Sequence, residues 1–409
     1  MNKTDVLIVG GGASGLAAAI ELKRHTNLCV VVLEKLDRVG KKILATGNGR
    51  CNLLNEKATP EDYNDPDFVE KVFSAYDVQS DMDFFRSMGL LTVTDEAGRV
   101  YPRSTAAASV LDVLRLECAR LGVEFRLSEA AASIRKKDGL YVVNDIAAKT
   151  VIVACGGKAA PAQGSDGSGY ALLQHFGHKI SPLYPALVQI RTQVDFVKPL
   201  KGLRTTAALS LKEKGGSLHR TKGELLFTDY GLSGIAAMEL SRFAKEGTAV
   251  GIDFVPELSK EDLLSYLRTV RDRNPERPLE QYLVGILHSR IGQALLKDSL
   301  NVRLSAPCGS LSDAQLKALA GAIKHTSIPV LGTKGFPDAQ VTAGGAVVSQ
   351  FTDTLESKLS PGLFACGEIL HIDGRCGGYN LTFAWSSGRL AGRSAALRCG
   401  KDYWKRDLL

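Results

Sequence analysis

The sequence lacks several patterns that mark common classes of protein. Its eight cysteines form no C-x-x-C pair, so neither a zinc knuckle nor a dithiol redox pair is expected, and we predict no metal site. No uninterrupted apolar run is long enough to cross a bilayer. Met1 to Asp5 runs straight into an apolar segment, without the pattern of a signal peptide. These absences predict a reduced, cytoplasmic protein that has no membrane partner.

The charge balance is only weakly informative. The chain has 51 Lys and Arg against 44 Asp and Glu, a formal net charge of +7 over 409 residues. This modest excess permits anionic substrates or RNA but does not demand them, and we expect no DNA partner. The length predicts two or three domains, and the sequence leaves the oligomeric state open.

The stretch from Thr4 to Glu34 has the pattern of a unit that binds a dinucleotide. It contains, in order, a buried strand (Val6 to Val9), three glycines in G-x-G-x-x-G spacing (Gly10, Gly12, Gly15), a helix (Leu16 to Lys23), a second buried strand (Cys29 to Leu33) and an acid (Glu34). A glycine pattern alone has low specificity, but this order of elements is the context that supports it. The alternative is a glycine-rich turn without a ligand.

Each part of this stretch has a mechanical reason. Gly10 allows a tight turn, Gly12 lets a pyrophosphate approach the backbone, and Gly15 lets helix and strand pack closely. The helix N-terminus offers free N–H groups and partial positive charge to the phosphates. Glu34 can accept hydrogen bonds from ribose hydroxyls, and its charge disfavours the 2′-phosphate of NADP.

A second glycine-rich loop follows at Gly47 to Asn52. Its small residues let the backbone approach a flat ligand, and Arg50 adds a permanent cation with a planar donor fork. The alternative is an ordinary surface loop with a turn at Asn48-Gly49.

Two later segments are expected to return to the nucleotide site. Thr150 to Gly157 reads as a buried strand that ends in glycines, and Leu359 to Leu370 reads as a turn and a strand followed by Gly367-Glu368. A helix begins near Asn380, so the last segment repeats the opening order of elements. FAD is long enough to reach both segments and fits better than a mononucleotide. Gly164 to Gly169 resembles a phosphate loop, but no second G-x-G-x-x-G follows a strand, so we predict no separate NAD(P)H domain.

The rest of the chain divides by its patterning. Residues 60 to 90 and Ser104 to Leu121 read as helical, and Val93 to Ser104 as a hairpin with Gly98 at its turn. Further strands are predicted at Val123 to Leu127, Leu140 to Val143, Leu187 to Thr192, Thr205 to Lys212, Ser217 to Thr228 and Thr248 to Phe254, with a helix at Ile235 to Lys245. The four strands after residue 186 suggest a small antiparallel barrel or sheet.

Residues 257 to 325 read as an inserted helical module. Ser259 and Asp262 form an N-terminal capping pattern, and residues 278 to 297 and 311 to 324 also have helical patterns. The module has ten Lys and Arg against eight acids, an excess of only two. We interpret it as a solvated surface, with contact to a polyanion as the alternative. His288 and His325 lack metal-ligand spacing and are predicted to be structural.

These residues together resemble a bacterial family of FAD-dependent flavoproteins. Its members are aminoacetone-oxidase-like proteins and bile-acid or ribosomal-RNA dihydrouridine oxidoreductases of the BaiN/RdsA type. The resemblance covers nearly the whole chain, and its most specific motifs are ATGNGRCN at 45–52, GELLFTDYGLSG at 223–234, VTAGGAVV at 341–348 and GEILHIDGRCGGYNLTFAWSSG at 367–388.

The resemblance implies an α/β fold of three parts in the glutathione-reductase-like superfamily. These are a discontinuous Rossmann-like FAD-binding domain (1–186 and 341–409), a β-barrel-like domain (187–256 and 326–340) and an inserted helical domain (257–325). It also implies roles. Gly10, Gly12, Ser14 and Gly15 would meet the pyrophosphate, Glu34 the adenosine ribose, and Gly367-Glu368 the ribityl or pyrophosphate region. Asn380 and Leu381 would place helix N–H groups near the flavin N1/O2 edge, where reduced flavin carries negative charge.

The full predicted cofactor site joins these residues to their neighbours. It comprises Gly10, Gly12, Ala13, Ser14, Gly15, Glu34, Lys35, Thr46, Gly47, Asn48, Arg50, Cys51, Asn52, Ala154, Gly156, Gly157, Gly367, Glu368, Gly378, Asn380 and Leu381.

The sequence departs from the family pattern at three positions. Asp229 stands where the family has a histidine before the tyrosine of T-H-Y-G-L-S-G-P, and Ile235 replaces the proline. His371 stands where the family often has an aspartate. If position 229 or position 371 takes part in proton transfer, the substrate or pH optimum differs from that of better-known members. The alternative is that both of these positions are peripheral.

The resulting hypothesis is an oxidoreductase that uses non-covalent FAD to transfer hydride to or from a small organic molecule, with NAD(P)H as a transient electron donor. The candidates for proton transfer are His371, Arg50, Cys51, Tyr230 and Cys376, and His371 leads because histidine titrates near neutral pH. Two alternatives stay open: a flavoprotein that reduces uridine in ribosomal RNA, and a flavin-binding protein without turnover.

Overall fold

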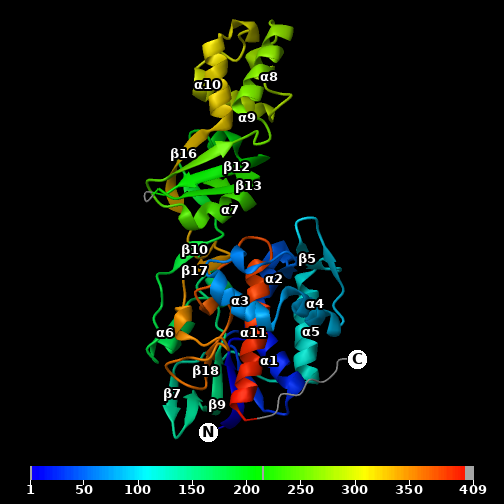
Figure 1. Ribbon diagram of the computed structural model, residues 1–409, viewed down its shortest axis with the longest axis vertical. Helices are drawn as coiled ribbons and strands as arrows, with labels where there is room; N and C mark the ends of the chain where they lie inside the picture. The colour runs from blue at the N-terminus through cyan, green and yellow to red at the C-terminus, as the bar shows by residue number, and fades with distance from the viewer. Residues whose placement is uncertain (1, 214–215, 401–409) are drawn as a thin grey trace. The chain divides into compact units, whose positions relative to one another are not determined.

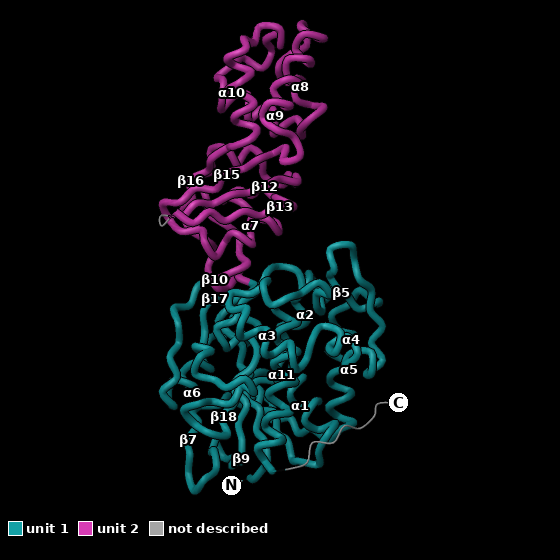
Figure 2. Tube along the Cα trace, in the orientation of Figure 1, with its two compact units in different colours: residues 1–184, 340–409 teal, residues 185–339 magenta. Residues whose placement is uncertain are grey.

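The computed structural model describes residues 2–213 and 216–400. The chain forms two compact units, unit 1 with residues 1–184 and 340–409 and unit 2 with residues 185–339 (Figure 2). The predicted division into three domains includes residue 1, residues 214–215 and residues 401–409, which lie outside the described residues, and that division stays a prediction.

Unit 1 is built on a sheet with the strand order β6-β2-β1-β9-β8-β7, and β18 pairs with β9 beside this path. Its strands are β1 (Asn2–Val9), β2 (Val30–Leu33), β6 (Glu124–Arg126), β7 (Ile134–Lys137), β8 (Leu140–Val143), β9 (Ile146–Val153) and β18 (Leu363–Ala365). β6, β2, β1, β9 and β18 run parallel. All four residues of β2 and all three of β18 are buried, as expected for parallel strands covered on both faces.

Helices pack around this sheet: α1 (Ala13–His25), α2 (Lys41–Ala45), α3 (Pro66–Ala75), α4 (Val78–Ser87), α5 (Ala107–Arg120), α6 (Ser168–Gln174) and α11 (Tyr379–Arg398). α11 lies beside α1, so the last helix packs against the first (Figure 1). Two glycines make the approach close. A Cβ on Gly388 would lie 2.3 Å from the carbonyl oxygen of Ser14, and one on Gly392 would lie 2.3 Å from that of Ala18.

Small strands complete unit 1. They are β3 (Leu54–Asn55), β4 (Thr92–Thr94), β5 (Arg99–Pro102) and β17 (Val341–Ala343), while β10 (Tyr184–Ala186) crosses the sequence boundary of the units. β4 and β5 form the predicted hairpin, which is confirmed. Gly98 closes its turn at φ 81°, and its N–H bonds the carbonyl of Asp95.

Unit 2 contains a closed barrel in the order β11-β14-β13-β12-β15-β16. The strands are β11 (Ile190–Thr192), β12 (Arg204–Lys212), β13 (Leu218–Phe227), β14 (Gly231–Ser233), β15 (Ala249–Asp253) and β16 (Thr326–Thr333), and α7 (Ile235–Leu240) follows β14. The sequence predicted four of these strands, whereas β14 and β16, which close the barrel, were not predicted.

The helical part of unit 2 contains α8 (Lys260–Arg273), α9 (Ser289–Leu300) and α10 (Asp313–Lys324). Ser259 caps α8 by accepting the N–H of Asp262 at 3.0 Å, which confirms the capping pattern. The prediction of a helix from residue 278 was wrong, because α9 begins only at Ser289. A 3-10 helix at Leu279–Gln281 stands there instead, and the N–H groups of Leu279 and Glu280 bond carbonyls of residues 306 and 304.

The predicted α/β fold class is confirmed, with a Rossmann-type sheet, a barrel and a helical region. His288 accepts the N–H of Arg290 through its side chain at the start of α9, which fits a structural role. Within residues 2–213 and 216–400, no helix has both the length and the apolar character needed to cross a membrane.

Candidate functional site

Four neighbouring parallel strands of unit 1 end side by side, and each leads directly into predicted site residues. Leu33 at the end of β2 pairs with Val9 of β1, Val9 pairs with Val153 of β9, and Val153 pairs with Ala365 of β18. Glu34, Gly10, Ala154 and Gly367 therefore follow strands whose carboxyl ends are in register. Ligands of open α/β sheets bind at such an edge.

The three glycines of the first turn differ in what surrounds them. A Cβ on Gly15 would lie 1.9 Å from the carbonyl oxygen of Gly10, and one on Gly10 would lie 2.4 Å from that of Ala154. Gly10 also has φ of 110°. A Cβ on Gly12, in contrast, would have nothing within 4 Å. Gly10 and Gly15 thus permit the packing of the turn, whereas Gly12 borders open space.

The N-terminus of α1 begins directly at this open space. Gly12 is its N-cap residue, and no side chain caps the helix. The first turn of a helix has N–H groups without partners inside the helix. Here Ala13 and Ser14 present such groups where the sequence predicts an anionic ligand.

Glu34 is held beside the glycine turn. Its Oε2 accepts the N–H of Gly11 at 2.9 Å, and its Oε1 accepts the N–H of Leu36 at 2.9 Å. The carboxylate therefore organises the turn in addition to any contact with a ribose. Lys35, predicted to contact the cofactor, forms an ion pair with Asp166 at 2.7 Å.

The second glycine-rich loop is tightly bent and lies beside α11. Gly47, Asn48 and Cys51 all have φ near 55°. In the orientation that satisfies both of its groups, the side-chain amide of Asn52 donates to the carbonyl of Leu54 and accepts the N–H of Gly378, at 3.3 and 3.1 Å. The loop that begins at Thr46 is thereby tied to the residue that precedes α11.

The candidates Arg50 and Cys51 in this loop have contrasting environments. Arg50 is exposed, and its guanidinium lies over the ring of Tyr101 at 5.2 Å. Cys51 is fully buried, and burial raises the pKa of its thiol to about 11. The thiol therefore stays protonated near neutral pH, and the proton-transfer role of Cys51 stays a prediction.

Glu368 follows β18 and faces the backbone after β9. Its Oε1 accepts the N–H of Thr342 at 2.8 Å, and its Oε2 pairs with the ammonium of Lys42 at 2.6 Å. A Cβ on Gly157 would lie 3.0 Å from Glu368 Oε1, so the glycine permits this approach. Sequence reasoning missed Lys42 and Thr342, although Lys42 stands close before the motif at 45–52.

The N-terminus of α11 is another part of the predicted cofactor site. Gly378 precedes it at φ 100°, and no side chain caps it. The side chain of Asn380 accepts the N–H of Gly374 at 2.9 Å and donates to the carbonyls of Gly374 and Arg375 at 3.1 Å. Asn380 thus fixes the preceding loop, while the backbone of Asn380 and Leu381 lies in the first helical turn.

The remaining candidates are only partly located. His371 is half-buried, and its backbone bonds the carbonyl of Ala346 and the side chain of Asn64. Cys376 is half-buried, two residues before Gly378. Tyr230 belongs to unit 2, where the ammonium of Lys334 lies 4.4 Å from its ring centroid. Their roles stay predictions.

Two buried hydroxyl groups near Glu368 were also missed. Ser165 Oγ and Tyr170 OH hydrogen-bond to no described residue, although both side chains are buried. Only the tertiary structure could reveal them, because serine and tyrosine in a glycine-rich segment have no distinctive sequence pattern. An oxygen-rich ligand with hydrogen-bond acceptors fits this part of the edge, and FAD is such a ligand.

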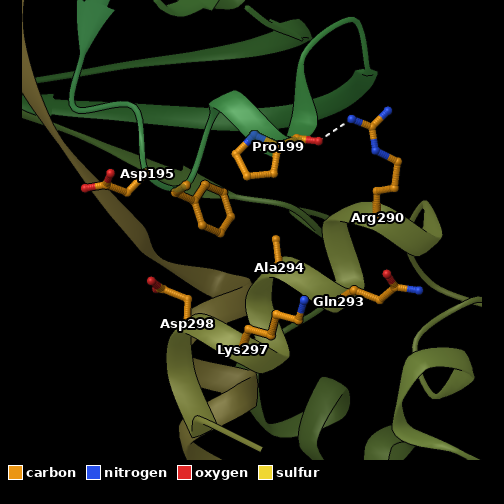
Figure 3. Close-up of a pocket in the computed structure, with 8 residues that line it drawn as sticks. Asp195, Pro199, Arg290, Gln293, Ala294, Lys297 and Asp298 are labelled. Carbon is orange, nitrogen blue, oxygen red and sulfur yellow. Dashed lines mark hydrogen bonds between the residues drawn. The ribbon is translucent and has the colours of Figure 1, made fainter. Parts of the chain in front are cut away.

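Unit 2 has an open hollow of about 440 Å³ between α9 and the segment that holds Asp195 and Pro199 (Figure 3). Arg290 donates to the carbonyl of Pro199 across it. Its charged lining residues, Asp195, Asp298, Arg290 and Lys297, balance in sign. Nothing in this lining resembles the glycine turns and helix starts of unit 1.

The comparisons with known proteins agree with this geometry. The model of a family described as HI0933-like protein Rossmann domain matches residues 4–394. The chain belongs to the HI0933-like family. It is 39% identical over 405 residues to a 3-dehydro-bile acid delta(4,6)-reductase of Clostridium scindens, with 96% of this chain and 98% of that protein covered.

Other relatives are more distant. A ribosomal RNA dihydrouridine synthase of Escherichia coli is 27% identical, with 95% of this chain and 96% of that protein covered. Among solved structures, a 3-ketosteroid delta1-dehydrogenase from Sterolibacterium denitrificans has a TM-score of 0.50 at 12% identity, covering 97% of this chain and 100% of that one, and shows the fold alone. The family and the site together identify the chain as an FAD-dependent oxidoreductase.

Proposed function

We propose that the protein uses non-covalent FAD to reduce a carbon–carbon double bond conjugated to a carbonyl group in a small organic molecule. The observation that carries this proposal is the set of four strand ends in register beside the uncapped start of α1, and the uncapped start of α11 supports it. The reductase relative at 39% identity supports the reaction class.

In the proposed site, FAD extends along the edge of the sheet at which the parallel strands of unit 1 end. Gly10, Gly12 and the N–H groups at Ala13 and Ser14 would bind the pyrophosphate, and Glu34 would accept from ribose hydroxyls. The start of α11, at Asn380 and Leu381, would stabilise negative charge at the flavin ring. When bound, FAD supplies two-electron hydride chemistry to the site.

The two named relatives support the substrate class. A 3-dehydro substrate with delta(4,6) double bonds contains a carbonyl conjugated to carbon–carbon double bonds, and the dihydrouridine product arises by saturating a ring double bond next to a carbonyl. In such a reduction a hydride adds to the β carbon, a proton adds to the α carbon, and the double bond is lost. NADH or NADPH would supply the electron pair.

The chain must also supply or relay the proton. His371 leads among the candidates because histidine is the residue type best suited to proton transfer, and Cys376 is the second candidate in unit 1. Arg50, with its guanidinium over Tyr101, would suit an anionic group on the substrate. Tyr230 of unit 2 is a further candidate for proton transfer. The division of the chain into three domains is also part of this proposal.

The first experiment tests cofactor and reaction together. The purified protein should be yellow and release FAD, not FMN, on denaturation. With NADH or NADPH, and without oxygen, it should convert a 3-keto-4,6-diene steroid into a product that has gained two hydrogens. A colourless protein that cannot be reconstituted with FAD would overturn the proposal, and FAD binding without reduction of any conjugated carbonyl compound would overturn its substrate class.

Ribosomal RNA is the second candidate substrate, since a relative named for it matches along nearly the whole chain. In the helical region, however, Arg268 and Arg271 pair with Asp313, and Lys324 pairs with Asp253. These pairs weaken the cationic surface that RNA would need. RNA binding with a steep salt dependence, together with loss of dihydrouridine in a deletion strain, would favour RNA.

The proposed compartment is the cytoplasm. All eight cysteines lie within the described residues and form no disulfide bond there, which fits a reducing environment.

A further inference from the structure

Two hydroxyl groups in unit 1 are buried without a hydrogen-bond partner. Ser165 is 4% exposed and Tyr170 is 5% exposed. Neither Ser165 Oγ nor Tyr170 OH bonds any described residue. Leaving a hydroxyl buried and unsatisfied is unfavourable, and native proteins rarely do so without a reason.

Both groups lie close to the cofactor edge. A Cβ on Gly156, in the turn after β9, would lie 3.0 Å from Ser165 Oγ and 4.0 Å from Glu368 Oε2. Tyr170 is on α6, where Gly169 packs against Cys155 and Ile369, the neighbours of the same two turns. Burial and the charge of Glu368 both raise the pKa of Tyr170, so its hydroxyl is a donor at physiological pH.

The charge around these hydroxyls is balanced before any ligand binds. Glu368 is neutralised by Lys42, whose ammonium lies 2.6 Å from Oε2, and its other oxygen accepts the N–H of Thr342. A lone carboxylate would repel a phosphate, whereas this ion pair does not. The hydroxyls of Ser165 and Tyr170 therefore remain as unused donors beside a region without net negative charge.

We propose that Ser165 and Tyr170 are cofactor ligands whose hydroxyls donate hydrogen bonds to oxygen atoms of the ribityl–pyrophosphate part of FAD. This inference rests on the proposed function, since it needs FAD at the same edge. It assigns a binding role to the segment from Gly164 to Gly169. In the sequence, this segment resembled a phosphate loop but had no assigned ligand. In this assignment the two hydroxyls are ligands of FAD and bond no described residue of the fold, while the ring of Tyr170 packs in the core of unit 1.

This assignment predicts that substitutions of Ser165 and Tyr170 lower the affinity for FAD without lowering the stability of the protein alone. Tyr170→Phe and Ser165→Ala remove a hydroxyl that bonds nothing in the protein alone, so stability without FAD should stay the same or rise. FAD binding should weaken, by about tenfold or more for each lost bond to a charged acceptor. A residue with a purely structural role would show the reverse pattern.

Tyr141 provides a matched control. It is also a buried tyrosine of unit 1, but its hydroxyl bonds Ser360 Oγ at 2.7 Å and the carbonyl of Pro361 at 2.8 Å. Tyr141→Phe should therefore lower stability and leave FAD affinity unchanged.

The experiment uses the full chain stripped of flavin. FAD is titrated by flavin fluorescence, and urea unfolding is measured without FAD, for wild type, Ser165→Ala, Tyr170→Phe and Tyr141→Phe. Weaker FAD binding with undiminished stability in either site variant supports the inference. Unchanged FAD affinity in both site variants overturns it, whatever happens to stability, and leaves the proposed function intact. A wild-type protein that binds no FAD overturns both.

Discussion

Arg389 of α11 and Asp81 of α4 form an ion pair inside unit 1, with Arg389 Nη1 2.8 Å from Asp81 Oδ1. The side chain of Asp81 is fully buried, and Glu21 of α1 binds the same guanidinium through its Oε2 at 2.9 Å. Ser386 also donates to Asp81. One buried network thus ties together three helices that carry or flank the predicted cofactor site.

Asp81 makes stability depend on pH in a specific direction. Burial raises its pKa from 3.8 to about 6, against the opposing effect of Arg389. The folded state therefore binds a proton between about pH 4 and 6 that the unfolded state has lost, so this contribution to stability is largest at low pH and declines as pH rises through 6. Relative to Asp81→Asn, wild type should gain stability in urea unfolding between pH 7 and 5.

Loss of the cation from this network should be costly. Arg389→Met removes the buried cation that Asp81 and Glu21 share and should lower the free energy of unfolding by about 3–5 kcal/mol at pH 7.5. The loss should shrink at pH 5, where Asp81 can take up a proton. An equal loss at both pH values would show that Asp81 does not titrate in this range.

Gly12 and Gly15 should respond differently to the same substitution. Gly12→Ala adds a methyl group that has nothing within 4 Å, so stability should hold, while FAD affinity falls at least tenfold because the methyl group occupies the approach of the pyrophosphate. Gly15→Ala forces a methyl group to 1.9 Å from the carbonyl oxygen of Gly10 and should cost about 1–3 kcal/mol of stability. FAD titration and urea unfolding of both variants test this, and normal FAD affinity in Gly12→Ala would contradict it.

Glu34→Ala should weaken FAD binding by roughly 1.5–3 kcal/mol for each charge-assisted hydrogen bond lost to the ribose. The variant also loses the acceptors for the N–H groups of Gly11 and Leu36, so a smaller loss of stability should accompany it. Glu34→Gln keeps one carbonyl oxygen and should lie between wild type and Glu34→Ala in both measurements. Unchanged FAD affinity in Glu34→Ala would show that the acid serves the turn alone.

His371→Asn should lower turnover by about 10²–10⁴ while FAD stays bound, if the imidazole transfers the proton. Reduction of the flavin by an artificial donor should change much less, because that step needs no protonation of substrate. Steady-state rates and the flavin absorbance of the purified variant measure the two effects. Full turnover would make His371 a bystander and move attention to Cys376 and Tyr230.

The sequence by itself determined the local elements and the type of site. The run from β1 through Gly10 to α1, the hairpin at Gly98 and the cap at Ser259 depend on residues close in the chain, so their patterns were sufficient. The same applies to the prediction of a dinucleotide site. Short-range steric contacts determine where glycine is needed, and the pattern of apolar residues along the chain indicates a buried strand. Both can be recognised in the sequence without knowledge of the fold.

Only the tertiary structure decided which distant residues meet. Lys42 and Glu368 are 326 residues apart, Asp81 and Arg389 are 308 apart, and no pattern in the sequence pairs them. Strands β14 and β16 close the barrel through pairing with distant strands, and a 3-10 helix at Leu279–Gln281, whose first two N–H groups bond residues 306 and 304, begins the segment where the sequence predicted one continuous helix. Burial of Cys51 and of the hydroxyls of Ser165 and Tyr170 likewise depends on atoms from many segments, and this burial raises the pKa of Cys51 and of Tyr170.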